Sequence, residues 1–257
     1  MTTNDTIIAS QYLPSAGCLN DRVVLVTGAS DGIGKAVAIS AASHGARVVL
    51  LGRSSKKLEA TYDTIVSADH PKPGIAVFDF ESADGEAFGQ LAETVSDTYG
   101  QLDGIAHIAG QLGTLTPFEF ADMTEFQRVM HVNFTAPVVL TKVLLPLLKA
   151  SNDASLVFAS SSVGRIGRAH WGAYAVSKFA TEGFAQVLAD ENRNTNIRVH
   201  VINPGKTRTD MRLAAYPGED RDTLPTPEQI APIFVYHLGA GVGKEGPLSI
   251  DAQSYTP

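Results

Sequence analysis

A strand, a glycine turn and a helix follow one another without a gap near the start of this chain. Residues 22–27 form a short β-branched run, and the glycines that follow are spaced GxxxGxG over residues 28–34. The helix-forming run KAVAISAASHG comes next, and residues 46–51 supply a second apolar run. This order predicts a βαβ unit, and a strand that is apolar throughout is typical of a parallel sheet covered on both faces.

The same alternation continues along the chain to residue 203. We predict further strands at 74–80, at 102–109, around Leu156 and at 197–203, and helices at 54–69, 84–99, 122–150 and around Tyr174. Six strands alternating with helices predict an α/β fold, a Rossmann-like doubly wound parallel sheet in a single domain with helices on both faces. Ligands of such sheets bind beyond the carboxyl ends of the strands.

Length and composition favour one domain. A chain of 257 residues with 44% hydrophobic content can bury a large core. Residues 1–20 lack sustained periodicity, so we expect an N-terminal extension laid on the surface, followed by a single domain over residues 21–257.

Charge and cysteine content narrow the class of partner. The net charge is -7 and there is no long basic run, so we expect no nucleic acid and no membrane as partner. We find no apolar stretch long enough to cross a bilayer, and the start MTTNDT does not read as a signal peptide. The one cysteine, Cys18, agrees with a reducing compartment, which predicts a cytoplasmic protein. The seven histidines show no metal-ligand spacing, so we expect no metal.

The glycine turn predicts a dinucleotide site. Between a strand and a helix, Gly28, Gly32 and Gly34 let the backbone and the helix amides approach a pyrophosphate. After the second strand, where an acidic residue would hold the ribose of NAD, the chain has Gly52 and Arg53. A guanidinium there suits a 2′-phosphate, so NADP(H) is the preferred cofactor and NAD(H) is possible. The alternative is that Arg53 only begins a solvated helix.

A hydroxyl, a phenol and an ammonium come together in residues 161–178. Tyr174 and Lys178 are spaced i, i+4, so a helix places them on one face, and Ser161 follows the strand around Leu156. A nearby ammonium favours phenolate, which predicts a lowered pKa for Tyr174 and proton exchange with a reacting oxygen. Read alone, this triplet would more often be a decorated helix surface and a serine turn than a catalytic group.

With these motifs in place, the chain resembles the classical short-chain dehydrogenases/reductases over nearly all of residues 21–251. The TGxxxGIG turn, the YxxxK pair and the asparagine in HVNFTA all match, and the closest likeness is to a bacterial branch without an assigned substrate. The resemblance implies four catalytic residues: Asn133, Ser161, Tyr174 and Lys178. It also implies these cofactor contacts: Gly28, Ser30, Asp31, Gly32, Ile33, Gly34, Arg53, Asp79, Ala109, Gly110, Tyr174, Lys178, Pro204, Gly205, Thr207 and Thr209.

The chain departs from this family at two places. Ile108 stands where the family has an asparagine that braces the central sheet, which puts local sheet geometry in doubt. The short GPLSIDAQ stands where the family has its last strand and terminal glycines, and this bears on the tetramer interface. We expect a homodimer or homotetramer, because the helices around Asn133 and Tyr174 carry surplus apolar residues: Val138, Val139, Leu144, Leu145, Phe179 and Phe184.

The resemblance implies an NADP-dependent short-chain dehydrogenase/reductase (EC 1.1.1.-), an oxidoreductase that moves hydride between NADP(H) and a carbonyl or secondary alcohol. The alternative is a dinucleotide-binding sensor or scaffold with little turnover, which would not need the intact catalytic set. A sugar-nucleotide epimerase or dehydratase would need a larger C-terminal part. We expect the substrate pocket to include Gln111, Leu112, residues 165–171 and residues 206–217. This mix favours a medium-sized ketone or aldehyde with a polar group.

Overall fold

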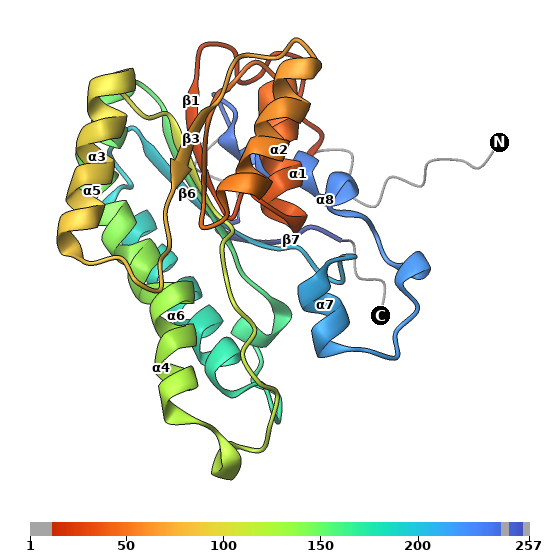
Figure 1. The fold of residues 1–257 in the computed structure, drawn as a ribbon. Helices are drawn as coiled ribbons and strands as arrows, with labels where there is room; N and C mark the ends of the chain where they lie inside the picture. Colours follow the sequence, from red (N-terminus) through yellow and green to blue (C-terminus); the bar gives the residue numbers. More distant parts are fainter. Residues whose placement is uncertain (1–11, 243–246, 254–257) are drawn as a thin grey trace.

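The computed structural model describes residues 12–242 and 247–253. Within them the chain forms one parallel sheet of seven strands in the order β3-β2-β1-β4-β5-β6-β7 (Figure 1). The strands are β1 Val23–Thr27, β2 Arg47–Gly52, β3 Gly74–Val77, β4 Gly104–His107, β5 Ala154–Ala159, β6 Ile197–Asn203 and β7 Ser249–Asp251. The order reverses between β1 and β4, and this switch point is where a ligand crevice is expected in such a sheet.

Helices connect the strands. They are α1 Gly32–Ser43, α2 Ser55–Ser67, α3 Gly85–Tyr99, α4 Met123–Met130, α5 Ala136–Ala150, α6 Gly172–Glu191, α7 Asp210–Ala215 and α8 Pro227–Leu238. Polar side chains start several of them, as when the Asp84 carboxylate accepts from the amide of Ala87 at 2.9 Å. Gly100 ends α3 in the left-handed region, with φ of 73°. The predicted α/β fold is confirmed.

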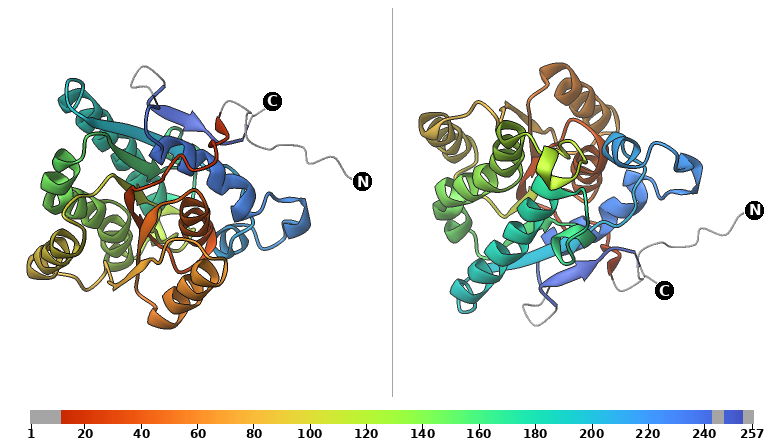
Figure 2. Two further views of the ribbon diagram at one scale, coloured as in Figure 1. Left: turned by 90° about the horizontal axis from the view of Figure 1, so that it is seen from above. Right: turned by 90° about the horizontal axis from the view of Figure 1, so that it is seen from below.

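The two faces of the sheet carry separate cores because successive side chains on a strand point to opposite sides. On one side, Val24 and Val26 pack with the buried residues of α1, α2 and α8. On the other side, Val23 and Leu25 pack with α3, α5 and α6. Figure 2 shows these two groups of helices on opposite sides of the sheet. Every residue of β1 is buried, which explains its unbroken apolar run.

Several element ends differ by a few residues from the sequence prediction, as in the strand predicted at 74–80, and two differences are larger. β7 is a seventh strand that we missed, because it has three residues and pairs only with Val201–Asn203 of β6. The predicted helix at 122–150 is divided by a π-helical turn over His131–Thr135. Pro137 lies just beyond this turn and has no N–H to continue the regular ladder.

The N-terminal segment is better anchored than we predicted. Leu19 is fully buried in the core that α1 and α8 share, so residues 12–20 do not simply lie on the surface. The ring of Tyr12 meets that of Tyr236 edge-on at 5.6 Å between centroids. Residues 1–11 lie outside the described residues. The domain boundary at residue 20 stays a prediction.

Within the described residues, one helical stretch, Met123–Ala150, is long and apolar enough to cross a membrane, contrary to our expectation from the sequence. In the most apolar window of that stretch, 44% is buried inside the protein. Its side chains at Leu140, Leu144 and Leu148 are fully buried against the sheet. The core helix of a soluble domain has the same composition as a membrane span, so length and apolarity alone do not separate the two.

Candidate active site

A cavity of about 680 Å³ lies at the carboxyl ends of the strands, beside the β1–β4 switch point. Its walls come from the glycine turn after β1, the ends of β2 to β6, the first part of α6 and the segment of α7. Every residue that we predicted to contact the cofactor lines this cavity. Their contacts with a cofactor stay a prediction.

The glycine turn is shaped for close backbone approach. A Cβ on Gly34 would lie 2.2 Å from the carbonyl oxygen of Gly28, so α1 can begin this close to the turn only with glycine. Gly28 has φ of 70°, and a Cβ there would meet the backbone of Ala109 at 3.1 Å. The first turn of α1 faces the cavity through Gly32, Ile33 and Gly34. These features fit the pyrophosphate of a dinucleotide.

Basic side chains lie at the end of β2. Arg53 lines the cavity directly after the strand, and Ser54 caps α2 by accepting from the amide of Lys57. Lys57 also lines the cavity, and its ammonium lies 2.5 Å from the carboxylate of Asp31. We missed Lys57 in the sequence, although its i, i+4 spacing from Arg53 was the available signal. No acidic residue follows β2 directly.

Ser161, Tyr174 and Lys178 meet at the opposite wall. Burial raises the pKa of Tyr174 to about 12, and its hydrogen bond with Ser161 acts in the other direction. Burial lowers the pKa of Lys178 to about 8, opposed by the charge of Glu182. The Lys178 ammonium donates to the carbonyl of Ala159 at 2.8 Å and lies 5.6 Å from the centre of the Tyr174 ring.

The predicted lowering of the Tyr174 pKa is therefore wrong for this structure. We expected the ammonium of Lys178 to dominate, but both groups are buried and the ammonium is directed to a backbone carbonyl. Loss of water around the phenolate raises the pKa of Tyr174 by more than the hydrogen bond with Ser161 lowers it. Tyr174 consequently stays protonated through the neutral range.

Asn133 does not line the cavity. It is buried in the π-helical turn, where its side chain accepts from the amide of Gln111 at 2.7 Å and donates to the carbonyl of Gln111 at 2.9 Å. Its amide also donates to the hydroxyl of Ser177 at 3.0 Å. Asn133 thus ties the segment after β4 to α6, the helix that carries Tyr174.

Ile108 does not disturb the central sheet. The hydroxyl of Thr27, at the end of β1, accepts from the amides of Ile108 and Ala109 at 2.9 and 3.0 Å. The side chain of Ile108 packs against the core on the α1 side. A β1 hydroxyl therefore braces β4 here without an asparagine.

The C-terminal segment holds the other side of the cavity. Asp251 accepts from Arg165 at 2.8 Å and from Asn203 at 2.7 Å, which links the loop after Ser161 to the end of β6. The amide of Gln253 donates to the carbonyls of Pro204 and Lys206, each at 2.8 Å. Asp251 and Gln253 therefore support the turn after β6 by side-chain hydrogen bonds.

Aromatic and aliphatic groups surround the expected substrate position. Trp171 lies 5.8 Å from Tyr174 and 5.9 Å from Tyr216 between ring centroids. Leu112 and Met211 pack on the same cluster. Trp171, at the end of the expected pocket segment 165–171, thus lines the cavity.

The charge of Arg212 in this wall is already compensated. Its guanidinium makes two hydrogen bonds to the carboxylate of Glu219, at 2.5 and 2.7 Å, and lies over the ring of Tyr216 at 3.7 Å.

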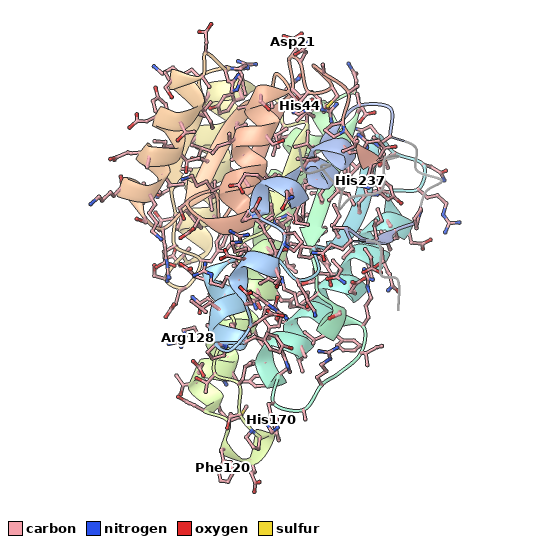
Figure 3. The ribbon with its side chains drawn as sticks, turned by 90° about the vertical axis from the view of Figure 1, so that its right-hand side faces the viewer. Asp21, His44, Phe120, Arg128, His170 and His237 are labelled. Carbon is pink, nitrogen blue, oxygen red and sulfur yellow. The ribbon has the colours of Figure 1, made fainter. Side chains whose placement is uncertain are left out.

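A second hollow of about 430 Å³, which shares Leu112 with the main cavity, lies on the side of His170. Figure 3 shows His170 close to Phe120 at one end of the molecule.

Comparison with known proteins bears directly on this geometry. The family model for short chain dehydrogenase matches residues 22–220. The chain belongs to the short chain dehydrogenase family. It is therefore an oxidoreductase of that family, which confirms the resemblance seen in the sequence.

Similar proteins place it in a bacterial branch without an assigned substrate. The uncharacterized oxidoreductase YciK of Escherichia coli K12 is 47% identical over 94% of this chain and 96% of its own length. A short chain dehydrogenase of Shigella flexneri complexed with NADP is 46% identical, with a TM-score of 0.90 over 93% of this chain and 99% of that one. One of Escherichia coli CFT073 complexed with NADPH is 47% identical, with a TM-score of 0.90 over 93% of this chain and 100% of that one.

Proposed function

We propose that this short chain dehydrogenase is an NADP(H)-dependent carbonyl reductase or alcohol dehydrogenase. The observation that carries the proposal is the meeting of Ser161, Tyr174 and Lys178 in the same cavity as the glycine turn and Arg53. The NADP and NADPH complexes of the two similar proteins support the choice of cofactor. The residues present fit this cofactor, because the glycine turn and the first turn of α1 line the cavity, where helix amides attract a pyrophosphate.

The residue roles follow from the geometry. When bound, NADP(H) supplies or accepts the hydride. Tyr174 exchanges a proton with the substrate oxygen, and Ser161, its hydrogen-bond partner, orients that oxygen. Lys178 holds the ribose of the nicotinamide side, since its ammonium faces the cavity beside Gly110. Asn133 is a positioning residue, because it acts through Gln111 and Ser177.

The protonation state of Tyr174 favours carbonyl reduction. With its pKa raised to about 12, the phenol is protonated at neutral pH, which is the state needed to donate a proton to a carbonyl oxygen and not the state needed to accept one from an alcohol. The wall of Trp171, Met211 and Leu112 is apolar, and the charge of Arg212 is compensated by Glu219. A medium-sized, uncharged ketone or aldehyde with one polar group fits such a wall.

Steady-state turnover of a panel of carbonyl compounds with NADPH tests this function. The panel contains cyclic, aromatic and aliphatic ketones and aldehydes of increasing length. We expect turnover with medium-sized neutral members, and little with carboxylates or long aliphatic chains. An absence of turnover across the panel in both directions, together with tight NADPH binding, would favour the sensor or scaffold instead.

Arg53 carries our prediction for cofactor choice. The guanidinium offers a charge-assisted hydrogen bond to a 2′-phosphate, which NADH lacks. We expect Arg53→Ala to weaken NADPH binding about tenfold and to leave NADH binding within about twofold. Dissociation constants for both cofactors, measured by fluorescence titration, check this. Equal weakening of both would show that Arg53 does not face the phosphate.

We also propose a homo-oligomer, at least a dimer. Exposed apolar residues form a stripe along α6 at Val176, Phe179 and Val187, each 44% exposed or more. Four residues that we had counted as surplus are part of the fold: Leu144 is fully buried, and Val139, Leu145 and Phe184 pack on the core. We expect light scattering at micromolar concentration to give at least twice the monomer mass. A monomeric mass would contradict the proposal.

A further inference from the structure

An exposed ion pair spans the mouth of the cavity between the glycine turn and α2. The carboxylate of Asp31 caps α1 with one oxygen, which accepts from the amide of Gly32 at 2.8 Å. Its other oxygen lies 2.5 Å from the ammonium of Lys57, a residue 26 positions away in the sequence. Both side chains line the cavity beside Arg53.

Stability does not explain this pair. The side chains of Asp31 and Lys57 are 60% and 59% exposed, and ion pairs in that setting contribute little to stability because water screens them. Its position is more informative, because the pair lies where the glycine turn and the end of β2 face the same space. Any group bound between Arg53 and the turn therefore meets the charges of both partners.

An unpaired Asp31 would oppose a phosphate at this place. Its carboxylate and a 2′-phosphate are both anionic, and the repulsion between exposed charges acts over roughly the 10 Å Debye length at 0.1 M salt. The charges that act on Lys57 are those of Asp31, Asp210 and Arg53. Those that act on Asp31 are Lys57 and Lys35. Lys57 is thus the cation in direct contact with the carboxylate that a phosphate would meet.

We propose that Lys57 is a second specificity-determining residue for the 2′-phosphate of NADPH, and that it acts mainly by neutralising Asp31. The guanidinium of Arg53 is then left free to bind the phosphate. Asp31 has a structural role of its own, because its side chain caps α1 at the glycine turn. The inference rests on the proposed NADP(H) preference. It extends that preference to Asp31 and Lys57, which are 26 positions apart in the sequence.

Three variants and one control test the proposal by titration of NADPH and NADH. Lys57→Met removes the charge and keeps the length of the side chain. Asp31→Asn removes the opposing charge and keeps a residue that caps helices well. Lys56→Met is the matched control, because Lys56 is an exposed lysine of the same helix turn that does not line the cavity.

We expect Lys57→Met to weaken NADPH binding about tenfold and to change NADH binding less than twofold. Asp31→Asn tightens NADPH binding about threefold. The double variant Asp31→Asn with Lys57→Met binds NADPH at least threefold more tightly than Lys57→Met alone. Lys56→Met stays within twofold of the wild type for both cofactors. A larger NADPH loss for Lys57→Met at 50 mM salt than at 500 mM supports a charge effect.

Three results would overturn the inference. They are equal weakening of NADPH and NADH by Lys57→Met, an equal effect of Lys56→Met, and no recovery of NADPH binding in the double variant. The proposed function has its own readout, since wild-type protein that binds NADH as tightly as NADPH contradicts the cofactor preference whatever the variants do. If Arg53→Ala loses the preference for NADPH and Lys57→Met keeps it, Arg53 binds the phosphate and Lys57 has no part in the preference.

Discussion

Tyr174→Phe should abolish nearly all carbonyl reduction while NADPH still binds. The substitution removes one hydroxyl from a residue that is 9% exposed, so the ring and the packing of α6 remain. The proton donor to the substrate oxygen is lost, and a positioned acid or base typically contributes 10²–10⁴-fold to the rate. We expect kcat to fall at least about 10³-fold and the dissociation constant for NADPH to change less than about threefold.

The matched control is Tyr62→Phe. Tyr62 is partly buried and packs against the core on the α1 side, away from the cavity. It should keep wild-type kcat, which separates loss of a catalytic hydroxyl from loss of any tyrosine hydroxyl. Residual turnover within tenfold of the wild type in Tyr174→Phe would show that another group donates the proton.

Acid should unfold the protein well above the range in which carboxylates titrate. Burial lowers the pKa of His107 to about 3, that of His200 to about 4 and that of His237 to about 3. The charge of Arg198 adds to the shift at His200 and His237, and the two rings lie 4.4 Å apart. At pH 7 all three histidines are therefore neutral in the folded protein.

Acid lowers the free energy of unfolding because the unfolded chain binds more protons than the folded protein. In the unfolded chain a histidine takes up a proton as pH falls through about 6.5, whereas in the folded protein these three do not until about pH 3 to 4. Their contribution to stability is therefore complete above pH 6.5 and is lost as pH falls toward 4. At pH 5 each histidine lowers the free energy of unfolding by about 2 kcal/mol, and a typical domain has only about 5–15 kcal/mol in all.

Denaturant unfolding at pH 7 and pH 5 measures this loss, and His237→Leu isolates one contribution. Neither ring nitrogen of His237 has a hydrogen-bond partner among the described residues, so leucine removes the titration without breaking a hydrogen bond seen there. We expect the difference in unfolding free energy between the two pH values to shrink by about 2 kcal/mol in this variant. His70→Gln, outside the core, serves as the control. An unchanged difference in His237→Leu would contradict the role of this residue.

Much of the site could be predicted because its residues belong to short local motifs. The turn over residues 28–34 needs glycine for reasons of backbone space, as the 2.2 Å approach at Gly34 shows. The i, i+4 spacing of Tyr174 and Lys178 places both on one helix face wherever that helix packs. Unbroken apolar runs such as β1 indicated the parallel sheet.

Other features depend on contacts between distant parts of the chain. The ion pair of Asp31 and Lys57 joins residues that only the approach of α2 to the glycine turn brings together. The strand β7 is recognisable only through its pairing with β6, and the support of the turn after β6 comes from Gln253. Asn133 matched a motif, yet its side chain lies behind the cavity.

The sequence by itself determined the α/β fold, the family and the set of chemical groups around the cavity, because local spacing and periodicity specify each of them. Only the tertiary structure decided how those groups ionise. The pKa of Tyr174 is raised and not lowered because desolvation, which depends on everything packed around the ring, outweighs its hydrogen bond with Ser161. The histidines in the core show the same dependence, since burial lowers the pKa of His107 and that of His237 to about 3.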